Sequence, residues 1–369
     1  MSSIGIICEY NPFHNGHLYH LNKIKEMFPD SIIVLVMSGN FTQRGDTSII
    51  NKWDKTDIAL HYGIDLVIEL PFVFATQGAD IFAKASIEIL NTLNVDYLVF
   101  GSECNDKKYN NLVKDYLKEG VNYPTALSNA LIDITGKKIN QPNDILGITY
   151  IREILKLKSK IQPITIKRNN NYNCTELEDF FSSATSIRYA LKNNCNVSNQ
   201  VPEYTLRFLN NNLYFIDRYF KFLKYNILIN SHLENIQTVD EGIDHRIYKY
   251  IVESRSLEEL ILKIKTKRYT YNKLNRMFTH ILCNFTKEEA NSFEHIEYIR
   301  VLGFNSKGRL FLKNIKNEIG IPIITNFSST HSKMLDIEFR STCCYACILE
   351  ENDKLKLIES EYKNYPIQG

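Results

Sequence analysis

Two histidines near the start of the chain could bind phosphate. His14 and His17, separated by an Asn-Gly pair, follow a short apolar run at residues 4–7. That run predicts a buried strand, and apolar residues recur at helical spacing from Leu18 onward. The histidines therefore lie where a strand ends and a helix begins, which is where open parallel sheets bind ligands. The unpaired amides and the partial positive charge of a helix N-terminus suit an anion such as phosphate.

Two other interpretations of these histidines have to be weighed. They could be ordinary surface residues on the first turn of a helix, or they could bind a metal ion together with His20. Side chains six residues apart diverge on a helix, and no carboxylate or thiolate stands at obvious ligand spacing. The junction of strand and helix favours phosphate binding, and we expect no metal site here.

The composition is that of a soluble globular protein. The 369 residues are 44% hydrophobic and 23% charged, and this length allows two domains with their own cores. The net charge of +2 gives no overall signature of polyanion binding, so any nucleic-acid surface must be local. No apolar run approaches the length of a membrane span, and the start of the chain lacks the pattern of a secretory signal. We therefore expect a cytoplasmic protein that has no membrane contact and needs no obligatory protein partner.

The eight cysteines show no disulfide pattern, which suits a reducing compartment. Cys344 and Cys347 have the spacing of a redox or zinc pair, but no second pair accompanies them. We interpret them as buried small apolar residues, and the role of the cluster that they form with Cys343 stays open.

Strand-like and helix-like segments alternate through the N-terminal half. Further strands are predicted at residues 32–36, 66–70, 97–100 and 161–166, and helices at 51–62, 79–93, 107–117 and 144–157. This order predicts an α/β fold with a doubly wound parallel sheet. A change of composition around residues 193–204 places a domain boundary near residue 200. The predicted domains are 1–200 and a mainly helical 201–369, with strand-like segments near 298–308 and 322–325.

Two short motifs resemble signatures of the HIGH nucleotidyltransferase superfamily. His14-Asn15-Gly16-His17 resembles its HxGH motif, and residues 183–188 resemble its second signature, ISSTxxR, with Ala184 in place of the second serine. The resemblance implies a Rossmann-like nucleotidyltransferase domain in which His14, His17 and Arg188 act on the phosphates of ATP. A simple helix N-cap at Ser183 would also explain the second motif, and both interpretations can hold together.

Five blocks together resemble the tRNA(Met) cytidine acetate ligase family. They are residues 8–20, 36–45, 65–71, 100–103 and 141–147. The resemblance implies an enzyme that joins acetate to AMP from ATP. The acetyl group is then passed to N4 of the wobble cytidine, position 34, of elongator tRNA(Met). The ATP-binding residues that the resemblance implies are Ile7, Cys8, Glu9, Tyr10, Asn11, Pro12, Phe13, His14, Asn15, Gly16, His17, Leu18, Tyr19, His20, Gly101, Asn143, Arg168 and Arg188.

Some of these assignments depend on the resemblance alone. Without it, Asn143 would be a turn residue after a proline, and Arg168 would be a solvated residue at a strand end. Arg44, in the polar loop after the second strand, could meet acetate or RNA, or it could simply be solvated.

The most basic stretch of the chain, residues 263–276, carries two interleaved tyrosines. Lysine and arginine neutralise phosphates and tyrosine stacks on unpaired bases, although a solvated helix face with core tyrosines would give the same pattern. Residues 267–270 resemble a further block of the ligase family, which favours tRNA binding. The predicted tRNA-binding residues are Lys265, Lys267, Arg268, Lys273 and Arg276.

The chemistry implied by the family needs charge neutralisation more than a general base. Acetate is already ionised near neutral pH, whereas the triphosphate and the departing pyrophosphate need positive partners. Mg²⁺ is expected from ATP chemistry, not from a visible ligand set. The polar loop at residues 38–45 could shield the reactive intermediate from water.

Two alternatives belong to other functional classes. A nucleotidyltransferase that adenylylates a small phosphorylated metabolite would explain both short motifs equally well, but not the size and basic stretch of the C-terminal half. A non-enzymatic ATP- or RNA-binding module would be expected to have lost some of His14, Gly16, His17 and Arg188, and all four are present.

Overall fold

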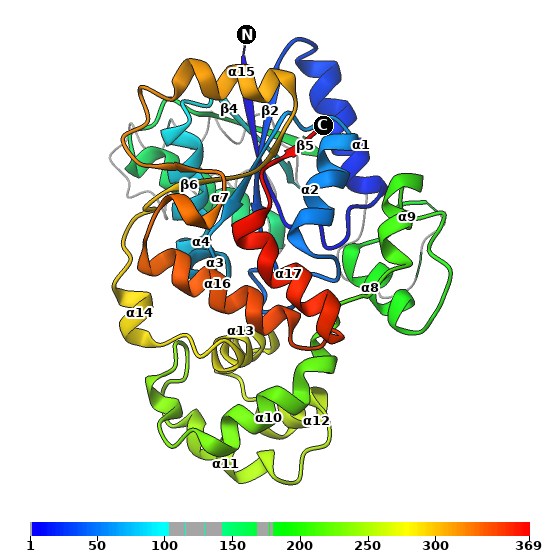
Figure 1. Ribbon diagram of the computed structural model, residues 1–369, viewed down its shortest axis with the longest axis vertical. Helices are drawn as coiled ribbons and strands as arrows, with labels where there is room; N and C mark the ends of the chain where they lie inside the picture. The colour runs from blue at the N-terminus through cyan, green and yellow to red at the C-terminus, as the bar shows by residue number, and fades with distance from the viewer. Residues whose placement is uncertain (1, 103–114, 116–128, 130–141, 168–176, 178–179) are drawn as a thin grey trace.

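The computed structural model describes residues 2–102, 115, 129, 142–167, 177 and 180–369, which are built around one mixed sheet (Figure 1). Five of its strands come from the N-terminal half and run parallel, as predicted. Their order in the sheet is β5-β4-β1-β2-β3. Their bounds are Ser3–Cys8 for β1, Ile32–Ser38 for β2, Leu66–Leu70 for β3, Tyr97–Ser102 for β4 and Gln162–Lys167 for β5.

Two adjacent strands in the middle of the sheet, β2 and β3, are buried along their whole length. All seven residues of β2 are buried, and this strand begins with the β-branched run Ile-Ile-Val, which packs well on a pleated surface covered on both faces. In the register between β1 and β2, Cys8 pairs with Met37. The polar segments that follow both strands therefore leave the sheet at the same edge.

Helices connect and cover these strands. The N-terminal helices are α1 (Asn15–Met27), α2 (Lys52–His61), α3 (Phe72–Ala75), α4 (Ala79–Thr92), α7 (Pro142–Lys156) and α8 (Ala184–Lys192). The later ones are α9 (Glu203–Leu209), α10 (Phe220–Ile229), α11 (Ile243–Ile251), α12 (Leu257–Ile264), α13 (Tyr271–Leu282), α14 (Lys287–Asn291), α15 (Ser306–Ile315), α16 (Lys333–Ala346) and α17 (Glu351–Lys363). The helix predicted at residues 107–117 lies outside the described residues.

The sheet is not purely parallel, because the C-terminal half completes it. Strand β6 (Ile299–Phe304) pairs antiparallel with β3, and β7 (Ile323–Ile324) and β8 (Ile367–Gln368) pair with β6. The parallel arrangement predicted from the N-terminal strands is confirmed, and β6 adds an antiparallel strand at this edge. The division at residue 200 stays a prediction, but the segment beyond it contains three strands of the common sheet.

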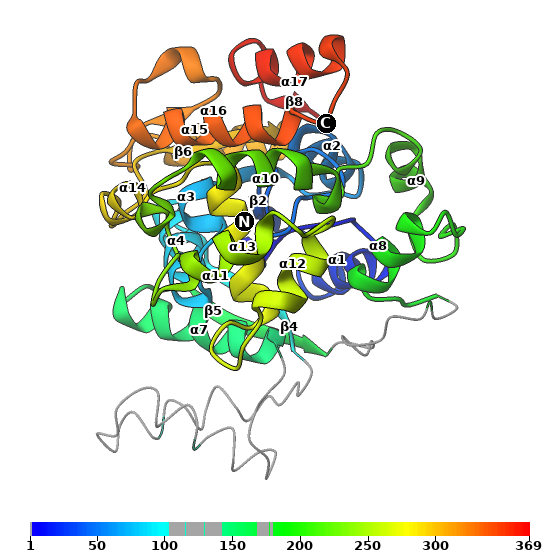
Figure 2. The same ribbon diagram turned by 90° about the horizontal axis from the view of Figure 1, so that it is seen from below.

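Helices α10 to α13 form the part of the C-terminal half that stands apart from the sheet. In Figure 1 they lie at the bottom of the molecule, below the carboxyl ends of the parallel strands. Figure 2, seen from below, places them in front of that edge, with α16 and α17 on one side and α7 on the other. The space between the sheet edge and these helices is therefore bordered by both halves of the chain.

A buried ionic cluster fastens the C-terminal segments to the sheet. Lys52 Nζ lies 2.7 Å from Glu69 Oε1 and 2.7 Å from Glu361 Oε1, and Arg300 Nη2 donates to Glu361 Oε2 at 2.8 Å. Burial raises the pKa of Glu338, which lies 3.6 Å from Lys52, to about 8. A protonated Glu338 leaves two cations opposite two carboxylates, so that the cluster is balanced in charge.

Removing one carboxylate from this cluster should destabilise the protein strongly. Glu361→Gln takes a negative charge from between two fully buried cations, and breaking such a cluster costs about 3–5 kcal/mol. Urea unfolding followed by circular dichroism measures the change. Glu359→Gln, on the same helix, removes an exposed ion pair with Lys363 and should change stability by no more than about 0.5 kcal/mol. Equal stabilities of the two variants would show that the cluster does not hold the segments together.

Candidate active site

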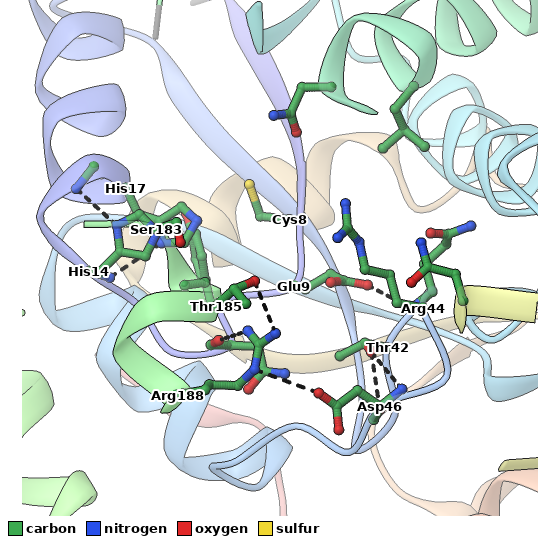
Figure 3. A pocket seen from close by; sticks show the side chains of 18 of the residues that line it. Cys8, Glu9, His14, His17, Thr42, Arg44, Asp46, Ser183, Thr185 and Arg188 are labelled. Carbon is green, nitrogen blue, oxygen red and sulfur yellow. Dashed lines mark hydrogen bonds and ion pairs between the residues drawn. The ribbon is translucent and has the colours of Figure 1, made fainter. Parts of the chain in front are cut away.

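A cavity of about 1120 Å³ lies at the carboxyl edge of the sheet. The end of β1, the start of α1, the loop at residues 42–46 and the first turns of α8 form its sheet side (Figure 3). Residues of α12 and α13 form its opposite side. The cavity therefore lies between the parallel sheet and the separate group of helices.

The two histidines cap the start of α1 reciprocally. The backbone N–H of Gly16 donates to His14 Nδ1 at 3.0 Å, and the backbone N–H of His14 donates to His17 Nδ1 at 3.3 Å. The ring centroids are 3.9 Å apart. Because each Nδ1 accepts a hydrogen bond, each neutral imidazole carries its proton on Nε2. The pair can therefore present two N–H donors beside the amides of a helix N-terminus, which suits phosphate oxygens.

Neighbouring residues hold the turn between β1 and α1 in place. Asn15 Nδ2 donates to the carbonyls of Phe180 and Asn199, which anchors the first turn of α1 to the segments before and after α8. Tyr10 has a φ of 48°, a conformation that side-chain-bearing residues rarely adopt. Its ring packs 4.8 Å from the rings of both Phe13 and His17, so that close packing maintains the strained backbone beside the histidines.

Arg188 connects three segments around the cavity. Ser183 caps α8 by accepting a hydrogen bond from the Ser186 N–H at 3.1 Å, and this helix presents Arg188 one turn later. Arg188 Nη1 donates to the carbonyl of Asn11 at 2.9 Å, and its Nε lies 3.6 Å from Asp46 Oδ2. Burial raises the pKa of Asp46, whereas the guanidinium beside it acts in the opposite direction. The guanidinium is thus positioned between the turn that carries the histidines and the loop at 42–46.

Lys55 and Glu9 hold the ends of β1 and β2 and the start of the loop at residues 42–46. Lys55 Nζ donates to the carbonyls of Glu9, Ser38 and Gly39 at 2.8–3.0 Å, and burial lowers the pKa of Lys55 to about 7. Three carbonyl acceptors match the three N–H groups of an ammonium, so the buried amine ties the ends of β1 and β2 together. The backbone N–H of Gln43 donates to Glu9 Oε1 at 2.7 Å and fixes the start of the loop.

The other side of this loop packs against α13. Gly45 has a φ of +76°, and a Cβ added there would lie 2.1 Å from the backbone nitrogen of Arg276. The Thr279 hydroxyl donates to the Gly45 carbonyl at 2.8 Å. Only glycine allows this approach, which brings a helix of the C-terminal half into contact with the loop at residues 42–46.

Most of the predicted ATP-binding residues line the cavity. Those that do are Ile7, Cys8, Glu9, Tyr10, Asn11, His14, Gly16, His17, Tyr19, His20, Gly101, Asn143 and Arg188. Pro12, Phe13, Asn15 and Leu18 are absent from the lining; Phe13 stacks on Tyr62 with ring centroids 5.0 Å apart. Arg168 lies outside the described residues.

The predicted tRNA-binding residues separate into two groups. Lys265, Lys267 and Arg268 are exposed in and before the turn between α12 and α13, and Arg268 pairs with Glu241 at 3.0 Å. Lys273 Nζ lies 4.3 Å from the centre of the Tyr269 ring. Arg276 instead lines the cavity, with Nη1 3.5 Å from the Gln43 carbonyl. Its position inside the site could not be found from the basic pattern alone.

Sequence reasoning missed several cavity residues. Thr42, Gln43 and Asp46 follow β2 in a loop whose polarity was visible, but their contacts depend on α8 and α13. Tyr271 and Asn275 of α13 also line the cavity, and no local pattern connects them with the histidines.

The described residues contain no group of three His, Cys, Asp or Glu side chains that could hold a metal ion. Four carboxylates line the cavity, and two of them, Glu9 and Asp46, lie on its sheet side. Mg²⁺ commonly binds through one or two carboxylates together with substrate phosphates, so these residues fit a magnesium ion that arrives with ATP. Over the same part of the chain, no helix is both long enough and apolar enough to cross a membrane.

The cysteine cluster is less buried than predicted. Cys343, Cys344 and Cys347 are half-buried near the end of α16, and Cys344 Sγ donates to the Leu282 carbonyl at 3.4 Å. They remain free thiols in the structure.

The parallel sheet, the histidine pair at its carboxyl edge and the arginine of α8 define a nucleotidyltransferase of the HIGH class. The family model described as HIGH Nucleotidyl Transferase matches residues 1–360. Among curated relatives, the tRNA(Met) cytidine acetate ligases of Caldicellulosiruptor bescii and Clostridium novyi are 39% and 40% identical. Both comparisons cover 100% of this chain. They cover 98% of the Caldicellulosiruptor bescii protein and 99% of the Clostridium novyi protein. The chain belongs to the tRNA(Met) cytidine acetate ligase family.

Solved structures agree with this assignment. Thermotoga maritima TmcAL without ligand has a TM-score of 0.86 and 30% sequence identity, and the comparison covers 100% of this chain and 99% of that one. A second structure of the same protein, bound with alpha-thio ATP, has a TM-score of 0.84 at the same identity and coverage.

Proposed function

We propose that the protein activates acetate with ATP and transfers the acetyl group to N4 of the wobble cytidine of elongator tRNA(Met). The observation that carries this proposal is the shared cavity. Its sheet side holds the histidines and Arg188, which suit a triphosphate, and its other side is formed by helices that carry the basic stretch. The curated relatives named as tRNA(Met) cytidine acetate ligases support the substrates, and a cytoplasmic location suits an enzyme that acts on tRNA.

In the first step an acetate oxygen attacks the α-phosphorus of ATP. A bond forms between that oxygen and phosphorus, the bond to the bridging oxygen breaks, and pyrophosphate leaves. His14 and His17 donate from Nε2 to phosphate oxygens, and Arg188 supplies a guanidinium to the leaving group. Mg²⁺, held by the phosphates and by Glu9 or Asp46, would supply further positive charge. No general base is needed, because acetate is already ionised.

In the second step the N4 amine of cytidine attacks the carbonyl carbon of acetyl-adenylate. The new C–N bond replaces the bond between the carbonyl carbon and the phosphate oxygen. AMP leaves, and one proton is lost from the amine. Lys55 contacts Ser38 and Gly39, Glu9 contacts Gln43, and α13 contacts Gly45. These contacts order the loop at residues 38–45, which supports a role for this loop in shielding the reactive anhydride from water.

Transfer of labelled acetate tests the whole proposal. Purified protein is incubated with ATP, labelled acetate and a transcript of elongator tRNA(Met), and the RNA is then digested to nucleosides. Label should appear as N4-acetylcytidine, and a transcript with uridine at position 34 should take up none. Label in neither transcript, with adenylylation of a small phosphorylated metabolite instead, would favour the alternative nucleotidyltransferase activity.

The exposed basic residues should contribute to RNA affinity through charge alone. Changing Lys267 and Arg268 together to alanine is expected to weaken tRNA binding and to flatten its dependence on salt. The slope should fall by about one unit for each phosphate that no longer has a cationic partner. Filter binding over a series of salt concentrations measures both effects. The control is the double change of Lys356 and Lys363 to alanine on α17, which should leave the slope unchanged. Unaltered affinity of the first variant would remove this turn from the tRNA-binding surface.

A further inference from the structure

One face of α13 points into the cavity that holds the histidines. Tyr271 and Asn275 both line this cavity, and their spacing of four residues places them on the same face of the helix. Across from them, Tyr189 lines the cavity from α8, next to Arg188. Several tyrosines of the described residues are largely exposed to solvent. Among these, only Tyr189, which is 60% exposed, and Tyr271, which is 47% exposed, line the cavity. Two accessible aromatic rings therefore stand at the site that the phosphate-binding groups share with α13.

Asn275 has an unsatisfied hydrogen-bond acceptor at this site. Its Oδ1 is shielded from solvent and accepts no hydrogen bond from the described part of the protein. A buried amide oxygen without a donor is unfavourable. Because Asn275 itself lines the cavity, a rotation of its side chain would let this oxygen accept an N–H group of a ligand. The acceptor thus favours a ligand with an amine or amide edge.

The charges around Tyr271 also favour a base over a phosphate. Burial raises the pKa of Tyr271, and the nearby carboxylates of Glu258, Asp217 and Asp46 raise it further. Carboxylates repel a phosphate but can accept from an amine. Of the basic stretch, Lys265, Lys267 and Arg268 are exposed in the turn before α13, outside the cavity, whereas Arg276 lines it. The phosphates of a nucleotide could therefore bind at the exposed turn between α12 and α13, while only its base enters the cavity.

We propose that Tyr271, Tyr189 and Asn275 form the site that receives the acceptor nucleobase, a pyrimidine with an exocyclic amine. This inference rests on the proposed function. The base would be turned out of its RNA strand and stacked against the tyrosine rings, as single-stranded bases are in many RNA complexes. Asn275 Oδ1 would accept one N–H of the exocyclic amine, which holds the nitrogen toward the adenylate formed beside His14 and His17.

A binding comparison isolates the contribution of the base. We would measure the affinity of the protein for an anticodon stem-loop RNA with cytidine at the acceptor position and for the same RNA with an abasic nucleotide there. The wild-type protein should bind the cytidine RNA at least about fivefold more tightly, the lower range for stacking of one base. Tyr271→Ala and Asn275→Leu should make the two affinities equal. Tyr271→Phe, which keeps the ring, should retain the difference.

The same variants give a catalytic test that separates this site from the proposed function as a whole. The readout is the ratio of acetate transfer to acetate-dependent ATP–pyrophosphate exchange, because only transfer uses the base. Tyr271→Ala and Asn275→Leu should lower this ratio at least about tenfold, and Tyr271→Phe should not. Tyr225→Ala, which removes an exposed tyrosine outside the cavity, is the control and should leave the ratio unchanged.

Three outcomes would contradict either the proposed function or the proposed base-binding site. A wild-type protein without exchange and without transfer contradicts the proposed function, and the binding comparison then still decides whether a base enters this site. A wild-type protein with exchange and transfer, but with unchanged ratios in both variants, overturns the base site alone. Cytidine and abasic RNAs that bind the wild-type protein equally well also overturn it.

Discussion

Replacing His17 with alanine lowers the rate of acetate-dependent ATP–pyrophosphate exchange by about 10²–10³-fold, the loss expected when one charge-stabilising donor is removed. The physical reason lies in the tautomer. His17 Nδ1 accepts the backbone N–H of His14, so its proton is on Nε2 and can be donated to an oxygen that gains charge as pyrophosphate leaves. The measurement is the initial rate of label exchange at saturating ATP and acetate.

Two further changes at this position separate its catalytic role from its capping role. His17→Asn keeps an acceptor near the position of Nδ1 but has no donor at Nε2, so it should be nearly as slow as His17→Ala. His17→Gln places an amide N–H close to the position of Nε2 and should recover part of the rate. The control is His245→Ala, which removes an exposed histidine of α11. Exchange by a folded His17→Ala protein within about twofold of the wild type would exclude this histidine from the mechanism.

Replacing Arg188 with alanine should have the second largest effect, a loss of about 10²-fold in exchange. Arg188 places a permanent positive charge in the cavity. It also connects two segments through its hydrogen bond to the Asn11 carbonyl and its ion pair with Asp46. Arg188→Lys keeps the charge but loses the planar fork, so it should fall between the alanine variant and the wild type. Arg207→Ala, an exposed arginine of α9 that lies outside the cavity, is the matched control.

The result for lysine distinguishes two roles of Arg188. Recovery of most of the rate would mean that charge is what the reaction needs. A lysine variant as slow as the alanine variant would mean that the geometry of the guanidinium, with its hydrogen bond to Asn11 and its ion pair with Asp46, matters more. Exchange at the wild-type rate in Arg188→Ala would contradict any role of the arginine in stabilising the leaving phosphates.

The N-terminal fold was predictable because its signals are local. Each of the five parallel strands is a short apolar run that ends in a turn or polar segment, and the structure places all five within a few residues of the predicted bounds. The position of His14 and His17 followed from the same pattern. A strand end and a helix start are visible in the sequence, and the helix N-cap was found there.

The C-terminal strands were harder to place for a physical reason. Strand β6 carries Arg300, a fully buried charge that interrupts its apolar pattern and is balanced only by Glu69 and Glu361 from other elements among the described residues. The strand-like segments predicted near 298–308 and 322–325 do contain β6 and β7, but β8 has two residues, too few for any periodicity to appear. Their place in the sheet depends on contacts between distant segments, which the local sequence does not contain.

The same limit applies to the candidate site. Gly45 could be recognised as part of a polar loop, but its close approach to Arg276 joins residues from opposite halves of the chain. Arg276 was predicted to meet tRNA on a basic surface, whereas the fold turns it into the cavity. The extension of the cavity from the histidines to α13 is therefore a result of the structure and not of any motif.

The most direct test of the central claim is ATP–pyrophosphate exchange by the purified protein in the absence of RNA, with and without acetate. Exchange that requires acetate is the predicted result, because it shows reversible formation of acetyl-adenylate. If acetate alone gives no exchange, the assay is repeated with bulk tRNA. Absence of acetate-dependent exchange under both conditions would contradict the account.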